Sequence, residues 1–404
     1  MRYFLSKIVL GILILSLLVG CFTPQGKPPP PPPLTPPTDW PGTDRIKLWK
    51  NGKWFLSGVN YPWLHYGHDF GVAPPWTHDG VSRQESTVRI DSDFSYLAKA
   101  GVHVIRWFVF SDGKASPEFD TNGTVTGLDE YFFKDMDQAL SLAERHNIYL
   151  IPVLLDFCIA RSCSKEPPSA NSPQAGGRAG IFLPENKQSF FDNALKPLLE
   201  KYGKHPNIFA WEIMNEPEGA MKIDDQESKK DNPVEQVHMQ DFIREAVKII
   251  HANASQMVTV GAKSRKYLDL WTDSGLDFYQ YHHYDRLEEA GYPLDYKYAN
   301  MNADLNLKNK PVIVGEFPTK MPAIVVGTSI NGTNRTLTNH LDIVLKNGYA
   351  GGLAWSYGAE DAYSDFSAMT REYTTWLKAY EASIGITDTS GKPFLPEEGA
   401  DPAF

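Results

Sequence analysis

Residues 210–217 read AWEIMNEP, an apolar run that ends in an amide, a carboxylate and a proline. Proline cannot continue a central strand, and it biases the residue before it toward extended geometry. The stretch therefore predicts a buried strand that stops at Asn215 and Glu216. In α/β barrels the chemistry lies at the carboxyl ends of the strands, so both side chains are candidate site residues.

A second stretch, PVIVGEFP at residues 311–318, has the same construction and places Glu316 at the end of its apolar run. Two carboxylates so far apart in the sequence meet only if their strands share one barrel mouth. Retaining glycoside hydrolysis requires such a pair, about 5–5.5 Å apart, with one member protonated and the other ionised. The two strand ends therefore make Glu216 and Glu316 candidate catalytic residues.

Short apolar segments alternate with helical periodicity along most of the chain. The segments with strand character are 55–60, 102–110, 148–155, 208–214, 257–261, 278–282, 311–315 and 351–357, and helical periodicity is clear in 91–100, 129–146, 188–203, 235–253, 336–347 and 366–382. Eight strands separated by helices predict an α/β fold of the (β/α)8 TIM-barrel class, with long loops at 157–186 and 217–234. A doubly wound open sheet is the alternative, but no GxGxxG motif follows the first strand.

A short element precedes the first barrel strand. Residues 46–49 and 54–58 flank the dipeptide Asn51-Gly52, which is typical of a tight hairpin turn. We therefore expect an N-terminal β-hairpin ahead of the barrel.

Composition limits the classes of partner. The chain has 404 residues, 42% of them hydrophobic, which is enough for a large core, and its formal charge is −10. An acidic chain with scattered Lys and Arg does not present the basic face that nucleic-acid binding needs. We expect a monomer without a cofactor or metal, and a carbohydrate as its partner.

The amino terminus has the pattern of an export signal. Residues 1–20 combine a positive start with an apolar run that is short for a membrane span. Residues 18–21, LVGC, resemble a bacterial lipobox, in which Cys21 is acylated; an ordinary signal peptide with an incidental cysteine is the alternative. Residues 21–43 are proline-rich and predict an extended spacer, followed by a catalytic domain over 44–384 and an irregular tail over 385–404. The protein is therefore expected to be exported and lipid-anchored at a bacterial cell envelope.

Two cysteines and a histidine-rich loop remain. Cys158 and Cys163 are close in sequence and, in an oxidising compartment, predict a disulfide; a metal site is the weaker alternative. The segments HYGHDFG (65–71) and THDG (77–80) gather His and Asp, but Trp63, Tyr66 and Trp76 lie among them. Aromatic rings stack on sugars, which favours a sugar-binding loop over a metal site.

The motifs also carry a family resemblance. AWEIMNEP, VIRWFVFSDG (104–113) and KNGKWFLSGVNYPW (50–63) resemble the retaining (β/α)8 glycosidases that include glycoside hydrolase family 5, and are closest in wording to its endo-β-1,4-mannanase branch. The resemblance extends over most of 45–382. It implies a retaining endo-acting hydrolase of β-1,4-mannan or glucomannan; a β-glucanase or transglycosylase, and more remotely a glycan-binding lipoprotein on an inactive barrel, are the alternatives.

The resemblance also implies roles for single residues. Glu216 is the acid/base, Glu316 the nucleophile, and Asn215 the partner of the sugar 2-hydroxyl; Arg106, His282 and Tyr284 support the pair, and Trp355 forms the floor of the site. Each supporting residue has a purely structural alternative, such as an ion pair of Arg106 with Glu212, or core positions for His282, His283 and Trp355. At the end of the third strand, Asp156-Phe157-Cys158 stands where many family 5 cellulases have Asp-x-His, so Asp156 is a candidate substrate-binding residue.

Overall fold

The computed structural model describes residues 42–52, 54–72, 78–161, 163, 176–223, 230–284, 293–320, 335–359, 361 and 363–384. The expected signal peptide with Cys21, most of the spacer and the tail over 385–404 lie outside the described residues. None of the helices formed by the described residues has the length and apolar character to cross a membrane.

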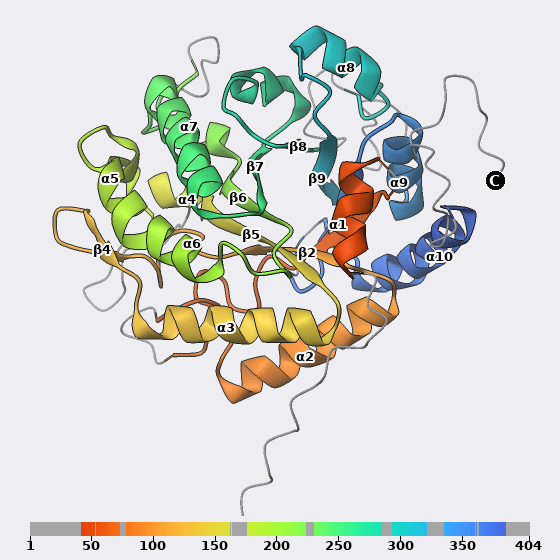
Figure 1. Cartoon of the computed structure of the whole chain (residues 1–404), viewed down its shortest axis with the longest axis horizontal. Coiled ribbons are helices and arrows are strands. Elements are labelled where there is room, and N and C mark those ends of the chain that lie inside the picture. Colours follow the sequence, from red (N-terminus) through yellow and green to blue (C-terminus); the bar gives the residue numbers. More distant parts are fainter. Residues whose placement is uncertain are drawn as a thin grey trace, which may run out of the picture. The chain divides into compact units, whose positions relative to one another are not determined.

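Eight parallel strands close into a barrel, which confirms the fold expected from the sequence (Figure 1). The barrel strands are β1 (Leu56–Asn60), β2 (Val104–Phe108), β5 (Tyr149–Asp156), β6 (Ala210–Asn215), β7 (Met257–Ala262), β8 (Tyr279–His282), β9 (Val312–Pro318) and β10 (Gly351–Trp355). Each strand pairs with the next barrel strand along the chain, and β10 closes onto β1. Because parallel strands are covered on both faces, they appear in the sequence as the near-continuous apolar runs noted above.

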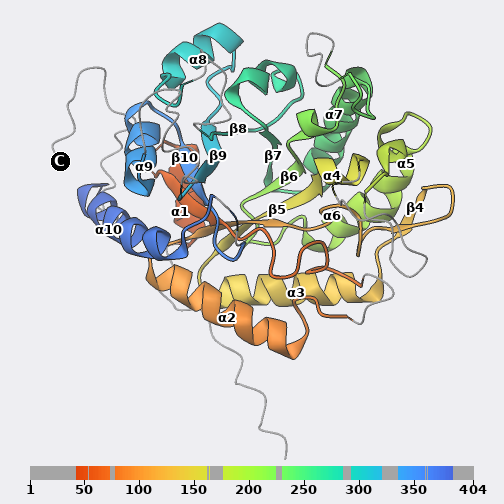
Figure 2. The ribbon, with the colours of Figure 1, turned by 180° about the vertical axis from the view of Figure 1, so that it is seen from behind.

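Helices and short turns cover the outside of the strands (Figure 2). The helices are α1 (Gly42–Lys50), α2 (Gln84–Lys99), α3 (Glu130–Arg145), α4 (Phe157–Ala160), α5 (Lys187–Phe190), α6 (Lys196–Tyr202), α7 (Gln236–Asn253), α8 (Tyr298–Leu305), α9 (Leu337–Lys346) and α10 (Phe366–Ile384). Short 3-10 segments are η1 (Ala179–Phe182), η3 (Pro217–Gly219) and η5 (Arg265–Trp271); η2 (Phe191–Leu195) is a π-helical turn between α5 and α6, and β3 (Glu118–Phe119) pairs with β4 (Val125–Gly127). In α3 the apolar residues Phe132, Met136 and Leu140 recur every four positions and are buried on one face. This spacing is why the sequence predicts the helical segments.

The expected N-terminal hairpin is wrong. Residues 42–50 form α1, and the first strand starts only at Leu56. Gly52 has a φ of 67°, and its N–H donates to the carbonyl of Trp49. The Asn51-Gly52 pair therefore ends a helix, a position that favours glycine for the same positive φ that a hairpin turn requires.

Helix α1 closes the amino-terminal end of the barrel. Trp49 donates from Nε1 to the carbonyl of Ala350, which immediately precedes β10, at 2.9 Å. Its ring packs edge-on against Phe209 and Phe278, which precede β6 and β8, with centroids 5.2 and 5.3 Å away. We call this the closed end; the carboxyl ends of the strands form the open end.

Inside the barrel, space toward the open end is tight. A Cβ at Gly261, on β7, would lie 2.4 Å from Glu212 Oε1 and 3.1 Å from His282 Nε2. Only glycine leaves room at this position for the polar side chains that converge from neighbouring strands.

Candidate active site

Arg106 on β2 is the centre of a buried polar cluster at the open end. Its guanidinium donates twice to Glu212, from Nε to Oε2 at 2.7 Å and from Nη2 to Oε1 at 2.6 Å. It also donates from Nη1 to Glu316 Oε1 at 2.7 Å, from Nη1 to Asn60 Oδ1 and from Nη2 to Asn215 Oδ1. The sequence left two interpretations of Arg106 open: support of Glu316, or an ion pair with Glu212. The structure contains both contacts. The planar fork of arginine is suited to such multiple recognition.

Register shifts explain how these side chains converge. Glu212 and Asn215 are three positions apart on β6, and regular alternation would point them to opposite faces of the sheet. The pairing of β6 with β7 is irregular between these two residues, so both side chains reach Arg106. The pairing of β8 with β9 is also irregular, just ahead of the partners His282 and Glu316. Such irregularities re-aim side chains next to active sites.

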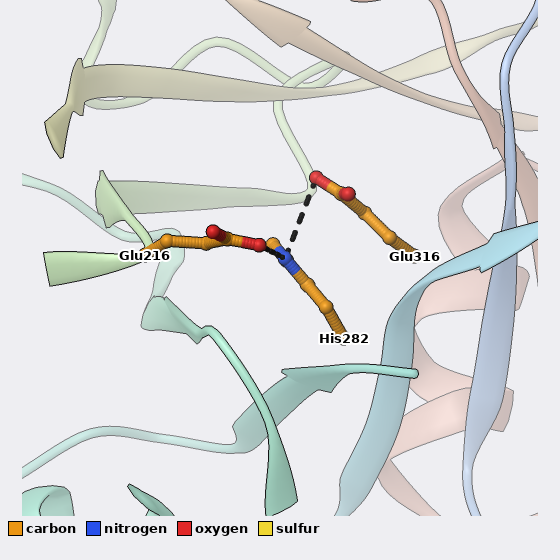
Figure 3. Close-up of side chains that lie close together, drawn as sticks. All are labelled: Glu216, His282 and Glu316. Carbon is orange, nitrogen blue, oxygen red and sulfur yellow. Dashed lines mark hydrogen bonds and ion pairs between the residues drawn. The ribbon is translucent and has the colours of Figure 1, made fainter. Parts of the chain in front are cut away.

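The two glutamates meet at His282 (Figure 3). His282 Nδ1 lies 2.9 Å from Glu216 Oε1 and 3.5 Å from Glu316 Oε1. One atom from each of the three side chains lies within 4.8 Å of the other two. This spacing is that of a retaining pair, since an inverting pair is about 6.5–9.5 Å apart.

Glu316 lies between two donors. Arg106 donates to Oε1, and the Tyr284 hydroxyl donates to Oε2 at 2.7 Å. Burial raises the pKa of Glu316 above its usual value, while the charges of His282 and Arg106 and the Tyr284 hydrogen bond oppose that rise. Both donors favour the ionised form against the effect of burial, as a nucleophilic carboxylate requires, and the nucleophile role of Glu316 stays a prediction.

Glu216 is presented by an unusual backbone turn. It has φ 43° and ψ 55°, a left-handed conformation that costs a non-glycine residue about 1–2 kcal/mol. Its N–H donates to the carbonyl of Gly261 at 2.7 Å, and its own carbonyl accepts from the N–H of Gly219. These contacts hold the strained turn that directs the carboxylate to His282.

His282 and Glu216 form a hydrogen bond that shifts the pKa of both groups. Burial raises the pKa of Glu216, but its hydrogen bond to His282 and the charge of that ring outweigh burial, and the pKa lies below the usual range. Burial lowers the pKa of His282, but the charge of Glu316 and the Glu216 hydrogen bond outweigh it and raise the pKa above the usual value. Transfer of the proton along the 2.9 Å hydrogen bond turns an ion pair into a neutral pair. A general acid at this position needs the proton on Glu216, so this hydrogen bond is a route by which His282 can supply it.

Asp156 ends β5 beside the pair. Its Oδ2 accepts from Asn215 Nδ2 at 2.6 Å, and its Oδ1 accepts from the backbone N–H of Cys158 at 2.8 Å. Burial raises the pKa of Asp156 to about 7, against the effect of these two hydrogen bonds. Cys158 is joined to Cys163 by a disulfide that begins directly after this contact.

Aromatic side chains gather on the rim of the open end. Trp63 packs edge-on against Tyr66 at 4.9 Å and against Trp355 at 6.2 Å, measured between ring centroids. Tyr66 is exposed and Trp355 is half-buried, with its Nε1 donating to Asp361 at 2.7 Å. Trp76 lies outside the described residues. The substrate-binding roles of Trp63, Tyr66, Trp355 and Trp76 stay predictions.

The histidines of the first loop make pairs with aspartates. His68 Nδ1 lies 3.0 Å from Asp79, and His78 Nε2 lies 2.9 Å from the buried Asp135 on α3. Asp69 accepts the backbone N–H groups of Leu64 and His65. Within the described ranges, the three-residue group Glu216, His282 and Glu316 is the one whose ligand atoms lie close enough for a metal ion.

Two residues of the polar cluster and one buried glutamate outside it were missed in the sequence. Asn60 ends β1 and donates to the carbonyl of Gly315, and Gln280 on β8 donates to Glu212 Oε2. Glu218 is fully buried and accepts from Trp271 Nε1 at 2.6 Å and from the N–H of Lys263 at 2.9 Å. Asn60 lies at the end of its strand, as Asn215 does, so the same pattern could have identified it. Gln280 could have been noticed as a polar residue inside an apolar strand.

Comparison with known proteins identifies the family of the chain. Residues 65–361 match the family described as "Cellulase (glycosyl hydrolase family 5)". The chain belongs to glycosyl hydrolase family 5. It is therefore a glycoside hydrolase, as the paired glutamates after β6 and on β9 indicate.

Relatives of this family 5 enzyme extend over most of its length. It is similar to a mannan endo-1,4-beta-mannosidase of Mytilus edulis, 28% identical over 75% of this chain and 83% of the relative, and to one of Cryptopygus antarcticus, 27% identical over 84% and 88%. Among solved structures, the beta-1,4-D-mannanase of Cryptopygus antarcticus superposes with a TM-score of 0.63 at 24% identity, covering 84% of this chain and 92% of that one. The endo-1,4-beta-mannanase of Eisenia fetida gives 0.62 at 24% identity, covering 79% and 90%. These superpositions support the fold of this family 5 chain.

Proposed function

We propose that the protein is an endo-acting, retaining β-glycoside hydrolase of β-1,4-mannan or glucomannan. The observation that carries the mechanism is the asymmetry of the two glutamates. Glu316 receives hydrogen bonds from Arg106 and Tyr284, whereas Glu216 is hydrogen-bonded to His282. One carboxylate is thus equipped as nucleophile and the other as proton donor.

The reaction proceeds in two displacements. Glu316 attacks the anomeric carbon while Glu216 delivers its proton to the departing glycosidic oxygen, which gives a covalent glycosyl-enzyme. Glu216 then takes a proton from a water molecule that attacks the same carbon, and Glu316 is released. Arg106 and Tyr284 stabilise Glu316 as it regains its charge.

The substrate assignment has separate support. The curated relatives that match most of this chain are named mannan endo-1,4-beta-mannosidases. The aromatic rim of Trp63, Tyr66 and Trp355 suits pyranose stacking, and stacking alone does not distinguish mannose from glucose. The distinction depends on contacts at the 2-position, where Asn215 is expected to act.

Two measurements test the proposal. Product NMR during hydrolysis should show retention of anomeric configuration, and inverted products would overturn the mechanism. On matched polymers, kcat/KM should be higher for β-1,4-mannan or glucomannan than for carboxymethylcellulose or mixed-linkage glucan. A preference for the all-glucose polymers would make the enzyme a β-glucanase and leave the two-step mechanism in place.

We also propose that the protein is exported and anchored through an acylated Cys21. The sequence LVGC directly after an apolar run supports this, and so does the proline-rich spacer that follows. The Cys21→Ser variant should leave the membrane fraction with unchanged specific activity. Failure of the wild type to incorporate labelled fatty acid would contradict the anchor.

A further inference from the structure

The side-chain amide of Asn215 is fixed between a guanidinium and a carboxyl group. Its Oδ1 accepts from Arg106 Nη2 at 2.6 Å, and its Nδ2 donates to Asp156 Oδ2 at 2.6 Å. A flipped amide would place its NH2 against a guanidinium and its oxygen against a carboxylate, so only one orientation is compatible with both neighbours. Among the described residues no second acceptor for Nδ2 is recorded, which leaves one N–H of Asn215 for a ligand.

Asp156 is itself held in place. It is buried, and its Oδ1 caps the short helix α4 by accepting from the N–H of Cys158. The Cys158–Cys163 disulfide closes a loop of the chain directly at this helix. Asp156 therefore offers Asn215 an acceptor whose position is set by β5 on one side and by the capped, cross-linked helix on the other.

We propose that Asp156 is a positioning residue that acts through Asn215, and that it thereby controls recognition of the sugar 2-hydroxyl at the cleavage site. This rests on the proposed function, in which Asn215 meets that hydroxyl. Asp156 holds the amide so that its remaining N–H is presented as a donor to the 2-oxygen. Mannose and glucose differ only at this carbon, so the geometry of one amide affects the choice between them.

The two acceptor oxygens of Asp156 matter as well as its shape. In Asp156→Asn the new side chain can keep the Cys158 contact only by turning its NH2 toward the NH2 of Asn215, where two donors oppose each other. Asn215 must then rotate or lose its partner, although the volume of the side chain is unchanged. Hydrogen bonds to charged groups have effects that correspond to about 10- to 100-fold in rate when they act on a transition state.

Paired substrates separate this role from a general structural one. An aryl β-mannobioside should be compared with the compound that lacks only the 2-hydroxyl of the sugar at the cleavage site. Removing this hydroxyl from the glucose analogue gives the same 2-deoxy sugar. Asp156→Asn should lower kcat/KM about 10- to 100-fold on the mannobioside, but less than about 3-fold on the 2-deoxy compound. Asn215→Ala should show the same pattern, and the double variant should be no worse than Asn215→Ala alone.

Asp112→Asn is the matched control. Asp112 is also a buried aspartate, and it accepts from the backbone N–H of Lys114 rather than from Asn215. Its variant should leave the ratio between the two substrates unchanged. Equal losses on both substrates in Asp156→Asn, or additive losses with Asn215→Ala, would overturn the positioning role. If the wild type released the aryl group from neither compound, the proposed function would fail, and this inference with it.

Discussion

At the closed end of the barrel, Trp49 packs edge-on against Phe209 and Phe278; at the open end, Arg106 lies among carboxylates and amides. The closed end gains stability from apolar burial, which needs no precise orientation. The open end removes charges from water, and mutual hydrogen bonds only offset that desolvation. Substitutions at the closed end should therefore lower the free energy of unfolding, and substitutions at the open end should lower the rate of catalysis.

The largest expected effect is at the open end. Glu316→Ala should lower kcat by at least about 10⁴-fold on every substrate, because no glycosyl-enzyme can form. The thermal midpoint should change little, since Arg106 keeps both hydrogen bonds to Glu212. Steady-state assays and thermal unfolding of the same preparation test this. Residual turnover near the wild-type rate would remove Glu316 from the mechanism.

Glu216→Ala should discriminate between substrates. Loss of the proton donor should reduce kcat about 10²- to 10⁴-fold on polymers, whereas activated aryl glycosides should still form the glycosyl-enzyme. Added azide should speed its breakdown and give a glycosyl azide with retained configuration. Glu216→Gln, which keeps the side-chain volume, is the companion variant, and absence of azide rescue in both would contradict the assignment.

The closed end should show the reverse behaviour. Trp49→Ala should lower the free energy of unfolding by about 3–5 kcal/mol, since a large buried ring and its hydrogen bond to Ala350 are lost. The kcat/KM of the folded fraction should remain that of the wild type. Denaturant titration with activity measured at low temperature separates the two, and a large fall in kcat/KM would show that the ends are coupled.

A smaller effect should reveal the cost of burying charge at the open end. Burial raises the pKa of Glu218 to about 7, against its hydrogen bonds from Lys263 and Trp271 and with help from the charge of Glu216. A carboxyl whose folded pKa exceeds its unfolded value stabilises the folded state below the unfolded pKa, and this contribution is lost as pH rises to about 7. The glutamine of Glu218→Gln does not titrate. Between pH 4.5 and 7.5 the free energy of unfolding of the wild type should therefore fall by about 3 kcal/mol relative to that of the variant. A pH-independent difference in unfolding free energy would refute the shift.

The sequence predicts the barrel well because apolar runs and strand-end carboxylates depend on local pattern. The motif AWEIMNEP identified the strand that ends just before Glu216, and PVIVGEFP identified the strand that contains Glu316. Helix α1 was misread, because a glycine with positive φ serves a hairpin turn and a helix end equally well. Only the packing of α1 against the closed end of the barrel distinguishes the helix from a hairpin.

The contacts within the site were less accessible. The irregular pairing of β6 with β7, which turns both Glu212 and Asn215 inward, depends on the neighbouring strand and leaves no mark in the sequence. The hydrogen bond between His282 and Glu216 joins β8 to the turn after β6, and residue types alone do not specify it. The substrate contact expected of Asp156 stays a prediction, and its recorded side-chain contacts, with Asn215 and with the backbone N–H of Cys158, were not foreseen from the sequence.

Helix α1 also determines how the enzyme can be attached to a solid support. The first described helix lies against the closed end, and Tyr380, near the end of α10, accepts from the N–H of Phe55 just ahead of β1. Trp49 and Tyr380, near the two ends of the described domain, therefore lie at the closed end, opposite Glu216 and Glu316. A bead, a resin or a fused module attached to helix α1 itself would lie at the end opposite the catalytic mouth, so that a long insoluble polymer could lie across the mouth without meeting the attachment.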